Sequence, residues 1–444
     1  MASFNRILPA LAQVIAARWD DLEPLLPIFV NRDLNDHVRL FLDATLEPTG
    51  EGEQWRKLQD LANAIHANLS PHVGEPDQIL DFKDSLLDLI KTSTTYPLSD
   101  KLGNILSNVY VVDRLAQEAT WETISSDIST VSHVVFYSIK GGIGRSTALA
   151  ACAWALADSG QRVLVLDLDL ESPVLSTFLL PASRQPAYGI TDWLVEDLVG
   201  NGDALLPEMH ASLGTQQRGS ELIVVPSHGH EPVEYVSKLG RVWMPGFTAD
   251  GQRQTWSERL MRMIQQLEER RQPTIVLIDS REGIDEVASA CVADLGAKLI
   301  YLFALDSLQT WQCYRILFEH WRLHDIATKI RERLRVVGAL LPTWGDQAFP
   351  QATAQLRENA YFSFSQRLYD EELAGAALPL VDESFNFDLP DIDAPHSPLP
   401  ICWDQGFAAI GSLHERLTAS EANQIKFVFG PLIDNLLVVC GAEP

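Results

Sequence analysis

A glycine-rich loop between a short apolar strand and a helix of small residues constrains this chain more than any other feature. Residues 133–147 read HVVFYSIKGGIGRST, and the helical pattern TALAACAWALADSG begins at Thr147. Glycines let a backbone approach a ligand closely and adopt positive φ. The N–H groups of such a loop, together with the dipole of the following helix, attract anions. The stretch therefore predicts a cradle for the phosphates of a nucleoside triphosphate bound with magnesium.

The loop differs from the standard pattern G-x-x-x-x-G-K-[ST] at two places. A lysine, Lys140, stands directly before Gly141, and Arg145 replaces the lysine that normally precedes the final Ser or Thr. The run KGGIGRST resembles the deviant Walker A loop K-G-G-x-G-K-[ST] of the ParA/MinD family of P-loop ATPases. The resemblance covers about residues 130–345. It implies ATP and Mg²⁺ as cofactors, held by Lys140, Gly141, Gly142, Ile143, Gly144, Arg145, Ser146 and Thr147.

The two basic residues of the loop have different implied roles. In the family, the lysine matched by Lys140 reaches across a dimer interface to the nucleotide of the partner subunit, which makes it a catalytic residue. Arg145 keeps the positive charge and can bind phosphate in a fork, but a guanidinium is wider and less compliant than an ammonium. We therefore expect nucleotide binding to be retained, and the rate of hydrolysis stays open.

Two further apolar strands end in carboxylates. Residues 162–169 read RVLVLDLD, and residues 274–283 read TIVLIDSREG. By resemblance, Asp169 orients the attacking water, and Asp279 is the Walker B carboxylate. The resemblance also implies that Asp167 and Ser146 join Asp279 near magnesium, and that the Gly283 amide senses the γ-phosphate.

Each motif also has a purely structural interpretation. The glycines alone fit a tight turn, and paired aspartates at the end of a strand fit a solvated loop. Their order, each at the end of an apolar strand, favours the nucleotide site. Residues 343–346 read TWGD, which imitates a guanine-binding motif with Trp in place of Lys, but a capped turn is favoured. ATP is the expected nucleotide, and GTP stays open.

The alternation of apolar strands with helical patterns over residues 130–345 predicts an α/β fold, a mostly parallel sheet flanked by helices. Before it, residues 1–128 show helical patterns and predict a partner-binding or regulatory helical domain, with a purely structural extension as the alternative. The core occupies residues 129–345, and residues 346–444 are expected to complete it with helices and an acidic, Pro-rich connector. The helices expected in the first domain are residues 5–18, 35–47, 53–69, 77–92 and 108–122.

Composition bears on partners and location. With 34 Lys and Arg against 60 Asp and Glu, the formal charge is −26, which argues against DNA because nonspecific DNA binding depends on bases that neutralise phosphates. The C-terminal stretch 423–444 is apolar with few bases and predicts a packed element rather than a membrane-binding helix.

Five scattered cysteines predict reduced thiols in a cytoplasmic protein. His228 and His230 fit a polar loop better than a metal site, and the Gly- and Pro-rich segment 227–255 predicts a long insertion.

Two functions remain in competition. The first is an ATP-driven switch that forms a homodimer with nucleotide, hydrolyses it slowly, and signals to a protein partner through the helical flanks. The alternative is a nucleotide-holding scaffold with little or no turnover, which the substitution at Arg145 favours. A DNA-partition ATPase is a third, less favoured reading because of the acidic charge.

Overall fold

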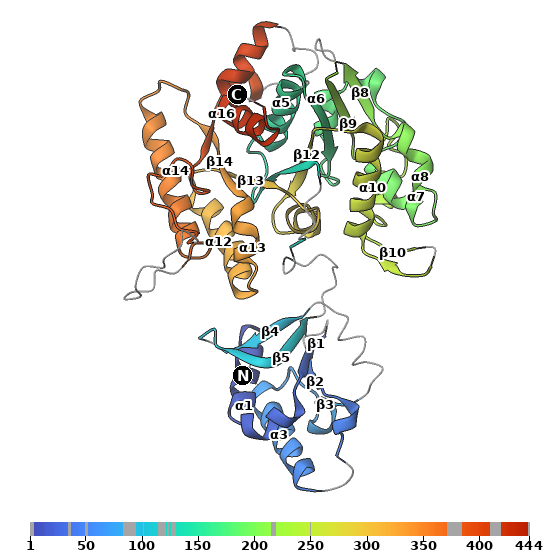
Figure 1. The fold of residues 1–444 in the computed structure, drawn as a ribbon, viewed down its shortest axis with the longest axis vertical. Coiled ribbons are helices and arrows are strands. Elements are labelled where there is room, and N and C mark those ends of the chain that lie inside the picture. Colours follow the sequence, from blue (N-terminus) through green and yellow to red (C-terminus); the bar gives the residue numbers. More distant parts are fainter. Residues whose placement is uncertain are drawn as a thin grey trace. The chain divides into compact units, whose positions relative to one another are not determined.

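The computed structural model divides the chain into two compact units, Met1–Gln117 and Glu118–Pro444 (Figure 1). Each unit has a sheet and its own hydrophobic core. The structure describes residues 4–33, 37–48, 52–82, 95–100, 102–113, 121, 124–125, 130–214, 219–248, 250–370, 384–408 and 419–442.

The larger unit is built on an eight-stranded sheet in the order β15-β14-β13-β6-β12-β7-β9-β8. Neighbouring strands are parallel, except that β8 runs antiparallel to β9 at one edge. The strands are β6 (Ser132–Ser138), β7 (Arg162–Asp167), β8 (Ala211–Gly214), β9 (Glu221–Val225), β12 (Ile275–Glu282), β13 (Leu299–Ala304), β14 (Leu334–Leu341) and β15 (Leu399–Cys402). The expected parallel sheet is confirmed.

Helices cover both faces of this sheet (Figure 1). One face packs against α5, α6 and α16, and the other mainly against α7, α10, α11, α12 and α14. The helices of the unit are α5 (Arg145–Asp158), α6 (Leu175–Leu179), α7 (Ile190–Asp197), α8 (Gly202–Leu205), α9 (Tyr235–Leu239), α10 (Trp256–Arg271), α11 (Glu286–Ser289), α12 (Leu308–Leu323), α13 (Ala327–Ile330), α14 (Ala348–Ser365), α15 (Gln405–Ala408) and α16 (Ala419–Val439).

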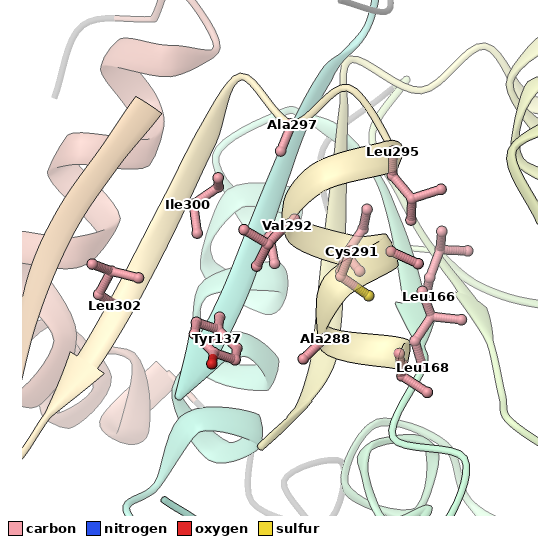
Figure 2. Close-up of a cluster of buried hydrophobic side chains, with 14 of the residues drawn as sticks. Tyr137, Leu166, Leu168, Ala288, Cys291, Val292, Leu295, Ala297, Ile300 and Leu302 are labelled. Carbon is pink, nitrogen blue, oxygen red and sulfur yellow. The ribbon is translucent and has the colours of Figure 1, made fainter. Parts of the chain in front are cut away.

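The central strand β6 shows why its sequence is apolar without alternation. Val135 and Tyr137 belong to the core on one face, and Val134 and Phe136 to the core on the other. A strand buried on both faces needs apolar residues at every position. In Figure 2, the helix formed by α11 and the following π-helical turn, Ala290–Asp294, lies on one face of the sheet, with Cys291 and Val292 packed among side chains of neighbouring strands.

The C-terminal residues complete this unit. β15 extends the sheet beside β14, and α16 packs against α5. The interpretation of the C-terminal stretch as a packed element is confirmed, since Phe429, Leu432 and Leu436 are buried in the core. The sequence pair Gly430-Pro431 predicts an interruption of this stretch, but α16 continues through Pro431. The edge strands β8 and β15 were also missed.

The smaller unit is not purely helical, which corrects the sequence-based expectation. The helices α1 (Phe4–Ala16) and α3 (Glu53–Leu69) confirm two of the five expected helices, and a short α2 (Trp19–Leu22) follows α1. They pack with a five-stranded sheet in the order β3-β2-β1-β5-β4. Its strands are β1 (Ile28–Arg32), β2 (Val38–Phe41), β3 (Leu80–Asp81), β4 (Tyr96–Ser99) and β5 (Ile105–Asp113).

The wrong helices have a clear physical cause. Residues 35–47 contain β2, and residues 108–122 begin within β5, where Val109, Val111 and Val112 flank Tyr110. β-Branched and aromatic side chains favour a pleated, half-buried surface. Most of the expected helix at 77–92 lies outside the described residues.

Candidate nucleotide site

The site begins where β6 ends and α5 starts. The loop between them turns through Gly142 and Gly144, whose φ angles are 72° and 84°. Only glycine adopts this region without strain. Within the described part of the chain, the backbone N–H groups of residues 141–144 donate to no protein acceptor, and α5 has no side-chain cap. The loop thus presents a row of open donors at a helix N-terminus, which is an anion-binding arrangement.

The register of the sheet brings the carboxylates of two strands together. In the pairing of β7 with β12, Asp167 lies opposite Asp279, and both are fully buried. Asp169 follows Asp167 by two residues and is also buried. Since β12 is the strand beside β6, all three carboxylates lie at the edge of the sheet from which the glycine loop emerges.

Arg145, the first residue of α5, lies among these carboxylates and is only 6% exposed. Its Nε donates to Oδ1 of Asp279 at 2.8 Å, and its Nη2 donates to Oδ2 of Asp169 at 3.0 Å. Nη1 donates to Oγ of Ser138 at 3.2 Å and lies 3.8 Å from Oε2 of Glu282. One guanidinium therefore ties together the ends of β6, β7 and β12.

Burial and mutual repulsion act on the protonation of these groups. Burial raises the pKa of Asp167 well above its usual range, and the Asp279 charge adds to the effect. Burial also raises the pKa of Asp169 to about 6, although Arg145 acts in the opposite direction. For Arg145 burial lowers the pKa, but Asp279, Asp169 and Glu282 outweigh burial and raise the pKa of the guanidinium. The centre holds one permanent cation among several carboxyl groups.

The donor chemistry suits magnesium, but the arrangement does not. Three buried oxygens, Oδ1 of Asp167, Oδ1 of Asp169 and Oδ2 of Asp279, have no hydrogen-bond partner, and Mg²⁺ prefers oxygen ligands. Yet among the residues that the structure describes, no group of three His, Cys, Asp or Glu side chains converges as a metal site. Ser146 lies in the first turn of α5, outside the network of Arg145. In this conformation the guanidinium contacts Asp279, one of the three residues expected near magnesium, and the three do not converge, so these residues do not fit the ion.

The segment that follows Asp279 lies against the glycine loop. A Cβ added at Gly141 would lie 2.8 Å from Oε1 of Glu282, so this carboxylate packs directly on the loop. The Gly283 N–H donates to the Ser138 carbonyl at 2.9 Å, and the Tyr137 hydroxyl donates to the Gly283 carbonyl at 2.8 Å. The Gly283 amide is thus engaged with β6, and its contact with a γ-phosphate stays a prediction that requires this bond to open.

A second arginine joins the same two loops nearer the surface. Arg281 contacts Oε2 of Glu171 at 2.5 Å and Oδ2 of Asp285 at 2.9 Å. Glu171 belongs to the loop after β7, whereas Asp285 caps α11 through a hydrogen bond to the Ala288 N–H. The loops after β7 and β12 are therefore joined by Arg145 in the interior and by Arg281 at the rim.

The remaining loop residues lie around this centre. Lys140 is exposed, and its Nζ lies 3.4 Å from Oε1 of Gln309 in the first turn of α12. Ile143 is buried in the core beside α5, and Thr147 is partly buried in the first turn of that helix. The structure thus brings Arg145, Asp167, Asp169 and Asp279 together, and leaves Lys140 at the surface.

The turn at residues 343–346 follows β14. Gly345 has a φ of 87°, the Asp346 N–H donates to the Thr343 carbonyl at 3.0 Å, and the Asp346 carboxylate accepts from the Ala348 N–H at 2.9 Å. The interpretation as a capped turn is confirmed, and the Asp346 carboxylate accepts a hydrogen bond from the first backbone N–H of α14.

The insertion 227–255 contains α9 and a small hairpin of β10 (Gly246–Phe247) and β11 (Arg253–Gln254). Its Tyr235 hydroxyl donates to the Leu170 carbonyl at 2.6 Å, and Lys238 pairs with Asp192 at 2.7 Å. His228 bonds through Nδ1 with the Gly229 carbonyl, and its ring packs against Tyr235. The insertion is thereby attached next to the loop that carries Asp169.

Sequence reasoning missed three participants: Ser138, Glu171 and Glu282. Ser138 ends β6 two residues before Lys140, and Glu171 lies two residues after Asp169. Their positions beside the motifs were the available signal. Their partners depend on the register of the sheet, which the sequence does not display.

A parallel sheet whose central strand leads through an open-amide glycine loop into a helix defines a P-loop type of nucleotide-binding domain. The chain belongs to the CobQ/CobB/MinD/ParA nucleotide-binding domain family, whose model matches residues 134–359, half of the chain. This confirms the ParA/MinD resemblance.

Solved structures of related architecture have low sequence identity. A pNOB8 ParA bound to nonspecific DNA is 14% identical, covering 70% of this chain and 98% of its own, with a TM-score of 0.43. The septum site-determining protein MinD of Pyrococcus horikoshii OT3, complexed with Mg-ADP, is 18% identical, with coverage of 70% and 98% and a TM-score of 0.42. The MinC:MinD complex of Aquifex aeolicus is 17% identical, with coverage of 69% of this chain and 96% of its own, and a TM-score of 0.39. No curated protein sequence matches the chain.

No helix within the described ranges is long and apolar enough to cross a membrane.

Proposed function

We propose that this protein is a nucleotide-dependent switch that binds ATP on the loop 140–147, dimerises in the bound state, and hydrolyses the nucleotide slowly. The observation that carries the proposal is the row of open N–H donors of residues 141–144 at the start of α5. Such donors bind phosphate oxygens. The exposed Lys140 is free of buried contacts and is therefore the residue that reaches a second copy.

Slow hydrolysis follows from the state of the centre. Asp169, which would orient the attacking water, is hydrogen-bonded to Arg145 at 3.0 Å. Glu282 packs on Gly141 and adds negative charge where phosphate would bind. Both contacts oppose a reactive arrangement, because phosphoryl transfer depends on positioning and on neutralised charge. They equally support the alternative, a nucleotide-holding scaffold without turnover.

Binding is tested by titration calorimetry with ATP, ADP and GTP in buffer with magnesium. Gly142→Ala should weaken ATP binding by about tenfold or more, or about 1.4 kcal/mol, because its methyl group would project from a loop that faces phosphate. Gly200→Ala is the matched control. Gly142 and Gly200 have φ angles of 72° and 74°, and nothing lies within 4 Å of an added Cβ at either. Both variants carry the same backbone strain, but only the first should lose affinity.

Dimerisation is tested by light scattering of the eluted protein in ADP and in ATP. Lys140→Ala should bind ATP yet remain a monomer. Lys298→Ala serves as control, because Lys298 is also exposed and its Nζ also makes one 3.4 Å hydrogen bond, to Ser132. Lys298 lies directly before β13. It is therefore at the amino-terminal ends of the strands, whereas the glycine loop is at their carboxyl-terminal ends. A natural chain whose mass is the same in ADP and ATP would contradict the switch.

Phosphate release separates the two functions. Slow release that Asp169→Asn abolishes, with ATP binding retained, would support the switch. Binding with no release above background would support the scaffold. We further propose that the smaller unit and the C-terminal helices transmit the nucleotide state to a protein partner.

The nature of other partners stays open to test. One similar structure is a ParA bound to nonspecific DNA, so the expectation that DNA is not a partner is not supported. A gel-shift assay at low salt, with and without ATP, tests it. The free cysteines, of which Cys152 and Cys291 are buried with pKa values raised by burial, support a proposed cytoplasmic location.

A further inference from the structure

The centre of the site already contains a cation that belongs to the chain. The Arg145 guanidinium donates to Asp279 at 2.8 Å and to Asp169 at 3.0 Å, and both carboxylates are at least nine-tenths buried. Buried charges require a partner of opposite sign within hydrogen-bond distance. Here that partner is Arg145, and Ser138 holds its third nitrogen at 3.2 Å.

The same carboxylates keep unused ligand capacity. One oxygen on each of Asp167, Asp169 and Asp279 is buried without a hydrogen-bond partner. Unpaired buried acceptors are costly, and in a folded protein they indicate an absent ligand or a functional role. The described residues nevertheless supply no converging set of three metal ligands. The capacity for a cation is present, but the guanidinium lies against two of the carboxylates that would form the site.

A guanidinium and a divalent ion cannot share this position. Two like charges a few ångströms apart repel strongly in a buried environment, and a metal bound by the free oxygens of Asp169 and Asp279 would lie beside the guanidinium that contacts the other oxygen of each carboxylate. A divalent ion therefore binds these carboxylates only after Arg145 has left them.

We propose that Arg145 is the resident cation of the Asp169–Asp279 pair, and that it keeps free divalent ions out of the site in the nucleotide-free protein. Removing the guanidinium creates a divalent-cation site that the natural chain lacks. This deepens the proposed function, on whose site it rests, by assigning the departure from the usual lysine a regulatory role: a metal is admitted only when Arg145 is drawn away from its carboxylates.

The test is an electron paramagnetic resonance titration with Mn²⁺, without nucleotide, on the full chain. Arg145→Met retains side-chain volume without charge and should bind one Mn²⁺ at least about tenfold more tightly than the natural chain, a difference of about 1.4 kcal/mol. Asp279→Asn added to Arg145→Met should remove the gained site. Equal Mn²⁺ affinity in the natural chain and Arg145→Met, or no binding by either, would overturn the proposal.

Arg281→Met is the matched control. Arg281 is also held by two carboxylates, Glu171 and Asp285, but at the partly exposed rim. Its removal should create no Mn²⁺ site. A gain as large as that of Arg145→Met would mean that any lost positive charge attracts the ion, and would overturn the assignment to Arg145.

A second measurement uses the natural chain, because Arg145→Met leaves buried carboxylates unpaired and can fail to fold. The melting temperature without nucleotide should be the same in millimolar MgCl₂ as in NaCl of equal ionic strength. A rise in MgCl₂ would overturn the proposal. Neither measurement is made with nucleotide present. A failure of ATP to bind would therefore contradict the proposed function without changing the outcomes expected here.

Discussion

Two buried arginines of the larger unit, Arg145 and Arg259, differ in how their positive charge is balanced by carboxylates. Arg259 is 0% exposed; its Nε donates to Asp197 at 2.7 Å, its Nη1 to the Met244 carbonyl at 2.7 Å, and its Nη2 to the Leu194 carbonyl. Asp197 also accepts two bonds from Arg262. Two guanidinium groups therefore donate to the single carboxylate of Asp197, and both of its oxygens accept hydrogen bonds.

At Arg145 the ratio is reversed. One guanidinium serves Asp169 and Asp279, with Glu282 at 3.8 Å, and three carboxylate oxygens in the centre remain without partners. A balanced, fully bonded charge is what a fold needs to hold itself together. An unbalanced one costs stability and is kept where a ligand completes it. The comparison assigns Arg259 to the scaffold and Arg145 to the site.

The largest expected effect on stability comes from the fully hydrogen-bonded arginine, Arg259. Arg259→Met should lower the free energy of unfolding by about 3–5 kcal/mol, because it breaks a buried pair and leaves two carbonyls unpaired. Urea denaturation followed by tryptophan fluorescence measures it, since Trp193 and Trp256 lie in the same core.

The control for that prediction is Arg262→Met. Arg262 contacts the same Asp197, but its side chain is 34% exposed and packs over the Trp193 ring. Its loss should cost about 1 kcal/mol or less. If both variants lower the free energy of unfolding by the same amount, the buried network of Arg259 does not stabilise this region. Arg259 would then no longer serve as the structural example in the comparison with Arg145.

The contrast between the arginines also marks what a sequence can predict. Six strands of the larger unit could be predicted because each is an apolar run followed by polar, glycine or proline residues, and the structure confirms them: residues 134–139, 162–169, 221–225, 274–283, 298–305 and 334–341. The glycine loop was recognisable for the same local reason. The strands of the smaller unit were missed because β2 is four residues long and β5 mixes buried with exposed positions, with Asn108 at a φ of 61°.

Partners of buried charges are a different matter. Arg145 and Asp279 are 134 residues apart in sequence, and Arg259 and Asp197 are 62 apart. Which carboxylate meets which arginine depends on the register of β7 against β12 and on the packing of α7 against α10. The types of residue at the site were therefore predictable, but the engagement of Arg145 with Asp169 was not.

The partly buried carboxylate of Asp294 forms no ion pair with an arginine within the described residues, and it sharpens the comparison. Burial raises the pKa of Asp294 to about 6; the Ser257 side chain lowers it in part and Glu258 raises it. The folded protein then binds a proton more readily than the unfolded chain, whose carboxylates titrate near pH 4. Stability from this group is present at low pH and is lost as pH rises through about 6.

Asp294→Asn should therefore stabilise the larger unit at pH 8 by about 1–2 kcal/mol, and by clearly less at about pH 4. Melting temperatures of the variant and the natural chain at the two pH values measure the difference. Asp325→Asn, at a surface turn after α12, is the control and should give the same small difference at both. A gain for Asp294→Asn that does not depend on pH would mean that charge burial is not its cause.

The smallest expected effect concerns the rim of the site. Arg281→Gln removes the pairs with Glu171 and Asp285, but the Arg281 and Glu171 side chains are 30% and 43% exposed. Ion pairs of this kind contribute about 1 kcal/mol or less, and salt screens them. The melting temperature should fall slightly in low salt, and the difference should shrink as NaCl is added. Since Arg281 and Arg145 join the same two loops, a large loss that salt does not reduce would show that the rim carries the link and that Arg145 does not hold these loops by itself.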